Sequence, residues 1–417
     1  MINCFIPFLS LPQARQTVRA LGLCDRIKNI YLLATEKIPD EVEGCEMLMI
    51  DSPASTATFR TIALHADTAY TLLYTKYTAF EPGQFAFERL LAIAGDTNAG
   101  MLYADRYLLK NGNSQQAPVI DYQKGSLRDD FDFGSLLFFR SSVLKQAVRA
   151  MDADYRFAGL YDLRLRVSEL AELVHVNEYL YSEVETDIRK SGEKLFDYVD
   201  PKNRAVQIEL EAVCTAYLKR VGGYLAPDFE PVTFDAGGFE QEASVIIPVR
   251  NRIRTIEDAI RSVLAQKTTF RFNLIIVDNH STDGTSEAIG KYTADGRVVH
   301  LVPERSDLGI GGCWNVGVHH PACGKFAVQL DSDDVYSGPD TLQKIVDAFY
   351  EQNCAMVVGT YRMTDFKMNE IPPGIIDHRE WTLENGRNNA LRINGLGAPR
   401  AFYTPVLRRI NLPNTSY

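Results

Sequence analysis

Short apolar runs alternate with amphipathic stretches between residues 243 and 330, and this alternation constrains the fold more than any other feature of the sequence. The runs lack a polar face, which is typical of strands buried on both sides of a sheet. The stretches 255–266 and 285–292 have helical spacing and helix-start signals. The predicted strands are 244–248, 273–278, 297–302 and 325–330. Strands and helices in alternation predict an α/β fold, with a mostly parallel sheet and helices on both of its faces.

The first half of the chain repeats this opening in a weaker form. Apolar runs at 3–7, 28–33 and 69–73 occur in the same order, and a helical stretch up to Leu21 follows the first of them. We interpret the chain as a diverged tandem duplication, with chance similarity between apolar strands as the alternative. A length of 417 residues is sufficient for two or three domains.

A turn-rich segment separates the two halves. A helical stretch at 205–217 ends before Gly222 and Gly223, and residues 227–242 have little periodicity. We therefore expect three parts: a first domain at 1–195, a helix and linker at 196–242, and a second domain at 243–417.

The composition excludes several classes of protein. Lys and Arg number 44 against 54 Asp and Glu, and a net charge of −10 argues against a nucleic-acid partner. The seven cysteines are scattered without a Cys-x-x-Cys pair, so neither a disulfide framework nor a thiolate zinc site is expected. The sequence has no transmembrane segment of about 20 apolar residues and no basic start of a secretion signal. We expect a cytoplasmic protein, either free or peripheral at the inner face of the membrane.

Polar residues follow three of the predicted strands in the second half. These segments are Pro248–Arg252, Asp278–Gly284 and Asp331–Asp334. In an open parallel sheet the strand ends share one edge, where ligands bind. The three carboxylates at 331, 333 and 334 repel one another unless a cation joins them. We therefore expect Mg²⁺ or Mn²⁺ together with a phosphate-bearing ligand, and a solvated acidic turn is the alternative.

Four motifs, in this order and spacing, resemble those of the family 2 glycosyltransferases. They are Val245-Ile-Ile-Pro-Val-Arg-Asn251, Ile276-Val-Asp-Asn-His-Ser-Thr-Asp-Gly-Thr285, Leu308-Gly-Ile-Gly-Gly-Cys-Trp-Asn-Val-Gly317 and Leu330-Asp-Ser-Asp-Asp334. Each motif alone is unspecific, whereas the four together are specific. The resemblance covers about residues 243–410 and is faint over 1–190. It implies two GT-A-like domains in tandem, of which the first is degenerate.

The resemblance also implies a reaction. Members of this family transfer a sugar, usually with inversion, from a nucleoside diphosphate sugar, and a UDP-sugar is the expected donor here. The implied acceptor is a saccharide or a lipid-linked acceptor, as in bacterial surface polysaccharide biosynthesis. The sequence identifies neither the donor sugar nor the acceptor.

Site residues are assigned by the same resemblance. The implied donor-binding residues are Pro248, Arg250, Asn251, Asp278, Asn315 and Asp331. Asp278 would meet the base, and the family's DxD motif falls on Asp331 and Asp333, which would bind the metal. Arg250 stands where many members carry Tyr, which puts base stacking there in question. Asp278 as the cap of its own turn and Asn315 as a helix-start residue are the simpler alternatives.

No catalytic residue is assigned. The family's general base is a carboxylate of a Glu-Asp pair that follows the acceptor region, and the sequence ends before such a pair. We therefore expect a second domain shortened at its C-terminus. A base elsewhere is the alternative, for which Asp365, Asp377 and Glu380 are poor substitutes. In the first half, Ala34 or Thr35 takes the place of Asp278, and Tyr74–Tyr77 that of Asp331–Asp334.

The leading interpretation is a metal-dependent inverting glycosyltransferase. A non-catalytic scaffold or partner subunit built from two glycosyltransferase-like domains is the alternative, favoured by the degraded first half. A sugar-phosphate nucleotidylyltransferase is disfavoured, because Pro248–Arg252 lacks the glycines of a phosphate-binding loop.

Overall fold

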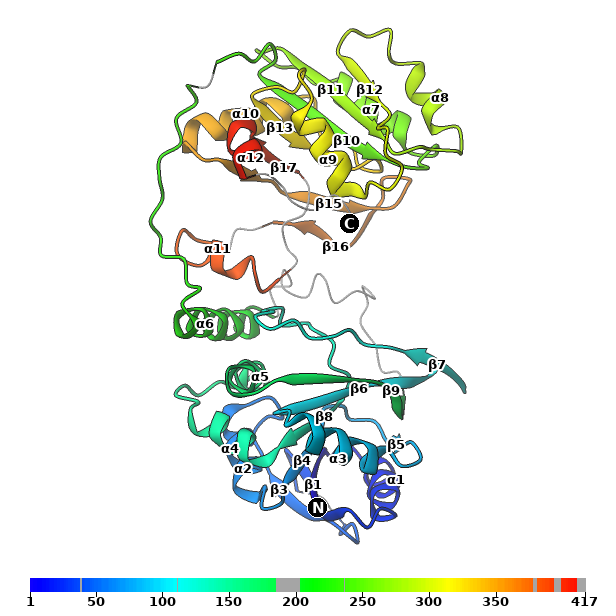
Figure 1. The fold of residues 1–417 in the computed structure, drawn as a ribbon, viewed down its shortest axis with the longest axis vertical. Helices are drawn as coiled ribbons and strands as arrows, with labels where there is room; N and C mark the ends of the chain where they lie inside the picture. Colours follow the sequence, from blue (N-terminus) through cyan, green and yellow to red (C-terminus); the bar gives the residue numbers. More distant parts are fainter. Residues whose placement is uncertain are drawn as a thin grey trace. The chain divides into compact units, whose positions relative to one another are not determined.

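The computed structural model describes residues 1–37, 40–110, 112–184, 203–235, 237–377, 381–393 and 399–410. The chain forms two compact units (Figure 1). Unit 1 comprises residues 1–226 and 380–394, and unit 2 comprises residues 227–379 and 395–417. Among the described residues, no helix combines the length and the apolar character needed to cross a membrane.

Unit 2 is built on a six-stranded sheet with the order β12-β11-β10-β13-β17-β14. The strands are β10 (Ala243–Val249), β11 (Phe272–Asp278), β12 (Val298–Leu301), β13 (Phe326–Gln329), β14 (Met356–Val358) and β17 (Arg400–Tyr403). The pairs from β12 to β13 are parallel, and β17 runs antiparallel to both β13 and β14. The four strands expected here are present within one residue of their predicted ends, and the α/β prediction is confirmed.

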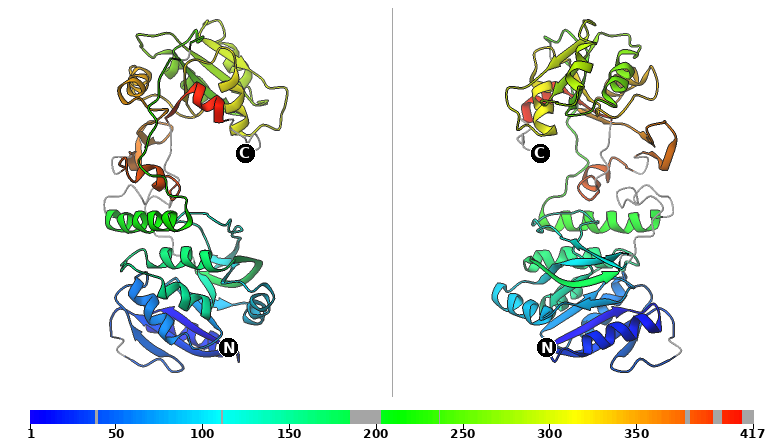
Figure 2. Two further views of the ribbon diagram at one scale, coloured as in Figure 1. Left: turned by 60° about the vertical axis from the view of Figure 1, so that its left-hand side comes forward. Right: turned by 90° about the vertical axis from the view of Figure 1, so that its right-hand side faces the viewer.

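Helices cover both faces of this sheet (Figures 1 and 2). They are α7 (Ile256–Leu264), α8 (Thr285–Gly290), α9 (Ile310–His319), α10 (Thr341–Gln352) and α12 (Thr404–Ile410). Val245 and Ile247 of β10 share a core with α7, α8 and α10, whereas Ile246 packs with α9 and α12. Alternate residues of a strand point to opposite faces, so β10, which is buried along its whole length, serves both cores. A β-hairpin of β15 (Tyr361–Thr364) and β16 (Glu370–Ile376) completes the unit.

The close approach of α9 to β10 depends on Gly317. A Cβ atom at this position would lie 2.6 Å from Cγ2 of Ile246. Only glycine therefore lets this helix lie so near to the central strand.

Unit 1 contains a nine-stranded sheet with the order β3-β2-β1-β4-β8-β6-β9-β5, and β7 pairs with β6. The strands are β1 (Ile2–Pro7), β2 (Ile27–Ala34), β3 (Glu46–Met49), β4 (Tyr70–Tyr74), β5 (Phe80–Pro82), β6 (Met101–Lys110), β7 (Asn113–Ala117), β8 (Leu136–Arg140) and β9 (Leu173–Val184). The helices are α1 (Leu11–Gly22), α2 (Thr56–His65), α3 (Ala86–Thr97), α4 (Ser141–Arg149), α5 (Gly159–Leu170) and α6 (Arg204–Val221). Two cores flank the sheet, with α1 and α3 on one face and α2, α4 and α5 on the other.

The described segment 381–393, which includes the short helix α11 (Gly386–Asn389), belongs to unit 1. The Asn388 side chain forms hydrogen bonds with both the N–H and the carbonyl of Leu225, each 3.1 Å long. The Arg392 guanidinium is buried and forms an ion pair with Asp129. The sequence analysis had assigned this segment to the second domain.

The two sheets share one pattern of strands. The order β3-β2-β1-β4-β8-β6 in unit 1 corresponds to β12-β11-β10-β13-β17-β14 in unit 2. In both orders, β8 or β17 is the strand that runs antiparallel to its two neighbours. A helix begins directly after this strand in each unit, α4 after β8 and α12 after β17.

Candidate functional site

The carboxyl ends of β10, β11 and β13 meet at one edge of the sheet in unit 2. Val249 of β10 pairs with Asp278 of β11, and Ile246 pairs with Gln329 of β13. Because the strands are parallel, the loops that follow them lie at the same edge. This is the arrangement on which the predicted site depends.

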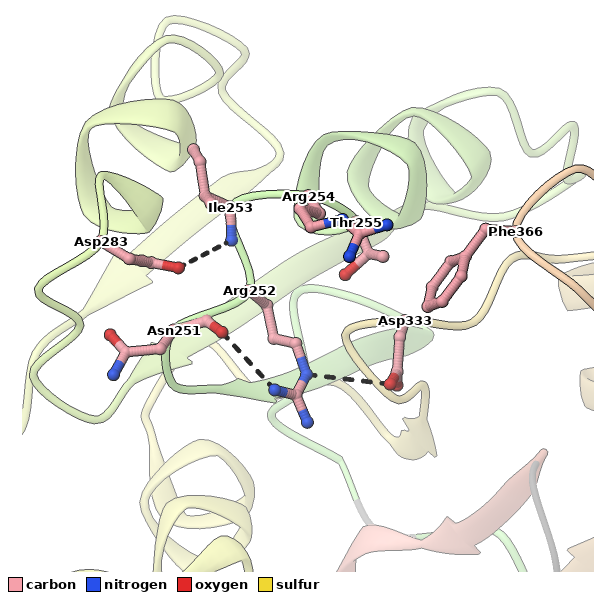
Figure 3. A pocket seen from close by; sticks show the side chains of 8 residues that line it. All are labelled: Asn251, Arg252, Ile253, Arg254, Thr255, Asp283, Asp333 and Phe366. Atoms are coloured by element: carbon pink, nitrogen blue, oxygen red, sulfur yellow. Dashed lines mark hydrogen bonds and ion pairs between the residues drawn. The ribbon is translucent and has the colours of Figure 1, made fainter.

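A cavity of about 340 Å³ opens at this edge (Figure 3). The loop after β10 supplies most of its wall, the loops after β11 and β13 supply one carboxylate each, and the β15–β16 hairpin supplies an aromatic ring. The lining residues are Asn251, Arg252, Ile253, Arg254, Thr255, Asp283, Asp333 and Phe366. Two arginines and two carboxylates around one small cavity suit a ligand that carries charge.

The loop after β10 is held by hydrogen bonds to the loop after β11. Asn251 has a φ of 54°, a left-handed conformation that Asn tolerates better than most residues. Its N–H donates to the Ser281 hydroxyl at 2.9 Å, and its side-chain oxygen accepts the Thr282 N–H at 2.8 Å. These bonds fix the start of the loop.

The next two residues of the loop are fixed in the same way. The Arg252 N–H donates to the Thr285 hydroxyl at 2.8 Å, and the Ile253 N–H donates to the Asp283 carboxylate at 3.1 Å. Hydrogen bonds from the Thr285 side chain and from the backbone lower the pKa of Asp283. The backbone of the loop is thus held at successive positions, whereas the Arg252 side chain is half exposed.

Asp278 ends β11 and is fully buried. One carboxylate oxygen accepts the Ser281 N–H at 2.9 Å, and the other accepts the Ser286 hydroxyl. Burial by itself would raise the pKa of Asp278, but the hydrogen bonds from Ser286 and Ser281 and the nearby His300 lower it overall. Asp278 therefore closes its own turn and does not line the cavity.

The acidic segment after β13 presents Asp333 to the cavity. The Asp333 side chain is 47% exposed, and its carboxylate lies 3.7 Å from Nε of Arg252. Asp331 instead accepts a hydrogen bond of 3.0 Å from the Gln329 side chain. Loss of hydration on burial, and then repulsion from Asp331 and Asp333, raises the pKa of Asp334 to about 6. The segment thus contains more negative charge than its surroundings neutralise.

The chemistry of this segment fits a hard divalent cation. Carboxylate oxygens are the ligands that Mg²⁺ and Mn²⁺ prefer, and such ions use one or two protein carboxylates and take their other ligands from water and phosphate. In the described part of the chain, only Cys24, Asp25 and Glu88 bring three potential ligand atoms within 4.8 Å of one another. The 331–334 segment is accordingly suited to an open site completed by a ligand, with Asp333 and Asp331 as the residues that would hold the ion.

The remaining predicted site residues lie away from the cavity wall. Pro248 is buried in β10 opposite Val277, and Arg250 is exposed beyond the end of that strand. Asn315 is half-buried in α9. Of the residues predicted from sequence, the cavity brings together Asn251 and Asp333.

Sequence reasoning missed several residues of the wall: Arg252, Ile253, Arg254, Thr255, Asp283 and Phe366. Most of them lie within or beside the quoted motifs, so the position of these loops at the strand ends was a usable signal. Phe366 had no such signal, because only the folded hairpin brings it to the cavity.

The largely parallel sheet and the charged cavity at its carboxyl edge place unit 2 among the α/β proteins that bind ligands at strand ends. Residues 244–409 match the family model described as Glycosyl transferase family 2. Over these residues the chain is therefore similar to the family 2 glycosyltransferases.

Individual relatives are similar over shorter stretches. The putative teichuronic acid biosynthesis glycosyltransferase TuaG of Bacillus subtilis is 33% identical over 120 residues, which are 29% of this chain and 46% of TuaG. An uncharacterized glycosyltransferase of Rickettsia conorii is 38% identical over 97 residues, 23% of this chain and 15% of that protein. The matched regions thus span less than half of either relative.

Solved structures with partial similarity include residues 1–349 of S. aureus TarS. That structure is 24% identical, with a TM-score of 0.34, and the match covers 41% of this chain and 49% of that one. A mannosyltransferase of Pyrobaculum calidifontis in complex with GDP-Man and Mn²⁺ is 17% identical, with a TM-score of 0.31 and coverage of 50% and 56%.

Proposed function

We propose that unit 2 binds a nucleoside diphosphate sugar, a UDP-sugar foremost, together with Mn²⁺ or Mg²⁺ at the edge cavity. The reaction proposed is transfer of the sugar, with inversion, to a saccharide or a lipid-linked acceptor. The observation that carries this proposal is that Asn251 and Asp333, from two separate motifs, line one cavity. The family match of residues 244–409 supports the same reading.

Each part of the cavity has a role in this proposal. Asp333, with Asp331 beside it, would hold the metal, which when bound neutralises the charge that develops on the departing diphosphate. Arg252 and Arg254 bring positive charge to the same cavity, and guanidinium groups suit phosphate oxygens. Because the chain as a whole is acidic, these two arginines make the cavity a local site that favours an anionic ligand.

Asp278 acts in this proposal through the loops rather than by lining the cavity. Its carboxylate accepts the Ser281 N–H, and the Ser281 hydroxyl accepts the Asn251 N–H. Asp278 thereby positions the turn that holds the nucleotide-binding loop. A direct contact with the base would require one of its buried oxygens to exchange partner.

We further propose that unit 1 is a glycosyltransferase-like repeat that no longer binds a metal-dependent donor. The shared strand order supports the repeat. When the two sheets are aligned by strand register, Ala34 corresponds to Asp278. Thr75 and Tyr77 correspond to Asp331 and Asp333. The correspondence predicted from sequence, which began at Tyr74, was therefore one residue too early.

The end of β4 in unit 1 is filled by protein charges instead. Glu183 is fully buried there, and its carboxylate lies 2.6 Å from Nζ of Lys76 and 2.9 Å from Nε of Arg106. In this internal ion cluster the buried carboxylate of Glu183 is already neutralised by two protein cations. This neutralisation favours a packing or acceptor-handling role for unit 1, and a scaffold role for the whole chain is the second candidate function.

Donor hydrolysis distinguishes the enzyme from the scaffold. The purified chain is incubated with UDP-sugars and GDP-sugars, with and without Mn²⁺, and release of nucleoside diphosphate is followed by chromatography. An enzyme releases UDP or GDP slowly from one donor, and only with metal. A chain that binds a donor but releases nothing, with saccharide and with lipid-linked acceptors added, supports the scaffold.

A further inference from the structure

We propose that Arg252 is an internal counter-ion of the metal site. In the ligand-free chain it neutralises Asp333, and when the metal binds Asp333 the Arg252 side chain turns to the diphosphate of the donor. The move of Arg252 to the diphosphate rests on the proposed function. The neutralisation of Asp333 by Arg252 concerns the metal alone.

The contact between Arg252 and Asp333 is loose. Nε of Arg252 lies 3.7 Å from Oδ2 of Asp333, which is beyond hydrogen-bond distance, and the two side chains are 50% and 47% exposed. Figure 3 shows the guanidinium reaching across the cavity toward the carboxylate. An exposed ion pair of this kind contributes little to stability, so a divalent cation can displace it.

The backbone of Arg252, in contrast, is fixed. Its N–H donates to the Thr285 hydroxyl, and both neighbours, Asn251 and Ile253, are bonded to the loop after β11. The other contact of the guanidinium is a weak hydrogen bond of 3.5 Å to the Asn251 carbonyl. A long side chain on a fixed backbone can therefore turn within the cavity without any movement of the loop.

Charge balance determines where the Arg252 side chain turns when a metal binds. A divalent cation on Asp333 repels the nearby guanidinium, and the two positive groups are compatible only when an anion lies between them. A diphosphate supplies that anion and is itself a preferred partner of arginine. Metal and nucleotide should therefore bind cooperatively, with Arg252 opposing the metal alone and favouring the pair.

Arg254 provides a matched control in the same cavity. Its guanidinium carbon lies 5.2 Å from the centre of the Phe366 ring, a cation–π contact on the far side from Asp283. Arg254 and Arg252 thus share residue type, exposure and cavity, but the ion pair with Asp333 is formed by Arg252.

The test is titration calorimetry of the full chain with MnCl₂ alone, and then with UDP in saturating Mn²⁺. We expect Arg252→Gln to bind Mn²⁺ about three- to tenfold more tightly than wild type, because a competing positive charge is removed. The same variant should bind UDP about three- to tenfold more weakly in Mn²⁺, because a charge-assisted hydrogen bond to phosphate is lost. Arg254→Gln should gain clearly less Mn²⁺ affinity than Arg252→Gln, because the ion pair with Asp333 is formed by Arg252. Arg252→Lys, which keeps the charge, should stay within about twofold of wild type. Circular dichroism checks that all variants are folded.

The outcomes separate the two proposals. Unchanged or weaker Mn²⁺ binding by Arg252→Gln, or an equal gain in Arg254→Gln, would overturn the counter-ion role. Tighter Mn²⁺ binding with unchanged UDP binding would overturn the transfer to the diphosphate. If Arg252→Gln gains Mn²⁺ affinity while no form of the chain binds UDP or GDP, the counter-ion role is supported and the proposed function fails.

Discussion

The buried carboxylate of Asp278 offers a sharp test of how the site is held together. Replacement by Asn keeps the shape of the side chain but turns one of its two accepting oxygens into a donor. Asp278 accepts the Ser281 N–H and the Ser286 hydroxyl. In the variant the Ser286 hydroxyl must turn to accept from the new amide N–H, and its own proton then loses the carboxylate acceptor. An unsatisfied buried donor costs about 1–3 kcal/mol, and loss of the negative charge weakens the remaining bond. We therefore expect Asp278→Asn to destabilise unit 2 by about 2–4 kcal/mol.

The two tryptophans allow unit 2 to be followed separately. Trp314 is buried in α9 of unit 2, and Trp381 belongs to the part of the chain that packs in unit 1. In a Trp381→Phe background, urea unfolding monitored by fluorescence reports unit 2. Asp295→Asn is the control, because Asp295 forms a partly exposed ion pair with Arg297, 2.8 Å apart, and should cost less than about 1 kcal/mol.

The pH dependence adds a second readout to the same variant. The pKa of Asp278 is lower in the folded protein than in the unfolded chain. The ionised carboxylate therefore stabilises the fold at any pH above the unfolded pKa, and this stabilisation is lost as the pH falls through the folded pKa. Wild type should lose stability in this acid range more steeply than Asp278→Asn. Equal urea midpoints and equal acid profiles for Asp278→Asn and Asp295→Asn would refute the positioning role.

Two further predictions concern the packing of α9 and the charge of the acidic segment. Gly317→Ala should destabilise unit 2 by about 1–3 kcal/mol in the same urea assay, because the added Cβ would lie 2.6 Å from Ile246; an unchanged midpoint would show that the helix can move away. The pKa of Asp334 is raised to about 6 in the folded protein, so between about pH 4 and pH 6 the folded state keeps a proton that the unfolded state has released. Without metal, the stability of wild type should therefore fall as the pH rises through this range. Mn²⁺ should suppress this fall in stability, and it should bind wild type more weakly at pH 5 than at pH 7. In Asp334→Asn the difference in Mn²⁺ affinity between the two pH values, measured by calorimetry, should be smaller. An equal difference in wild type and variant would contradict the role of Asp334.

Apolar patterning was sufficient to predict the four parallel strands of the sheet in unit 2, but β14 and β17 were not predicted. Strands such as β10 and β11 are buried along their whole length, so apolar residues dominate their sequences and give a clear signal. The parallel arrangement then put the loops after β10, β11 and β13 at one edge, and the structure has them there. This is why Asn251 and Asp333 could be placed in one site from sequence.

Other features depend on contacts that the sequence does not encode locally. Asp278 follows a strand like the other site residues, but its burial results from Ser281 and Ser286 closing the turn over it. Phe366 reaches the cavity only through the β15–β16 hairpin, and 381–393 packs in unit 1 through single long-range contacts such as Asn388 with Leu225. Periodicity describes how an element faces its core and contains no information on such partners.

In the proposed function, Asp333 holds a metal that joins the nucleotide to the cavity. Calorimetric titration of UDP into wild type and Asp333→Asn, each with Mn²⁺ and with chelator, tests it most directly. We expect Mn²⁺ to strengthen UDP binding to wild type by about tenfold or more, and Asp333→Asn to lose this gain while remaining folded. Equal metal-dependent binding of UDP by both proteins would contradict it.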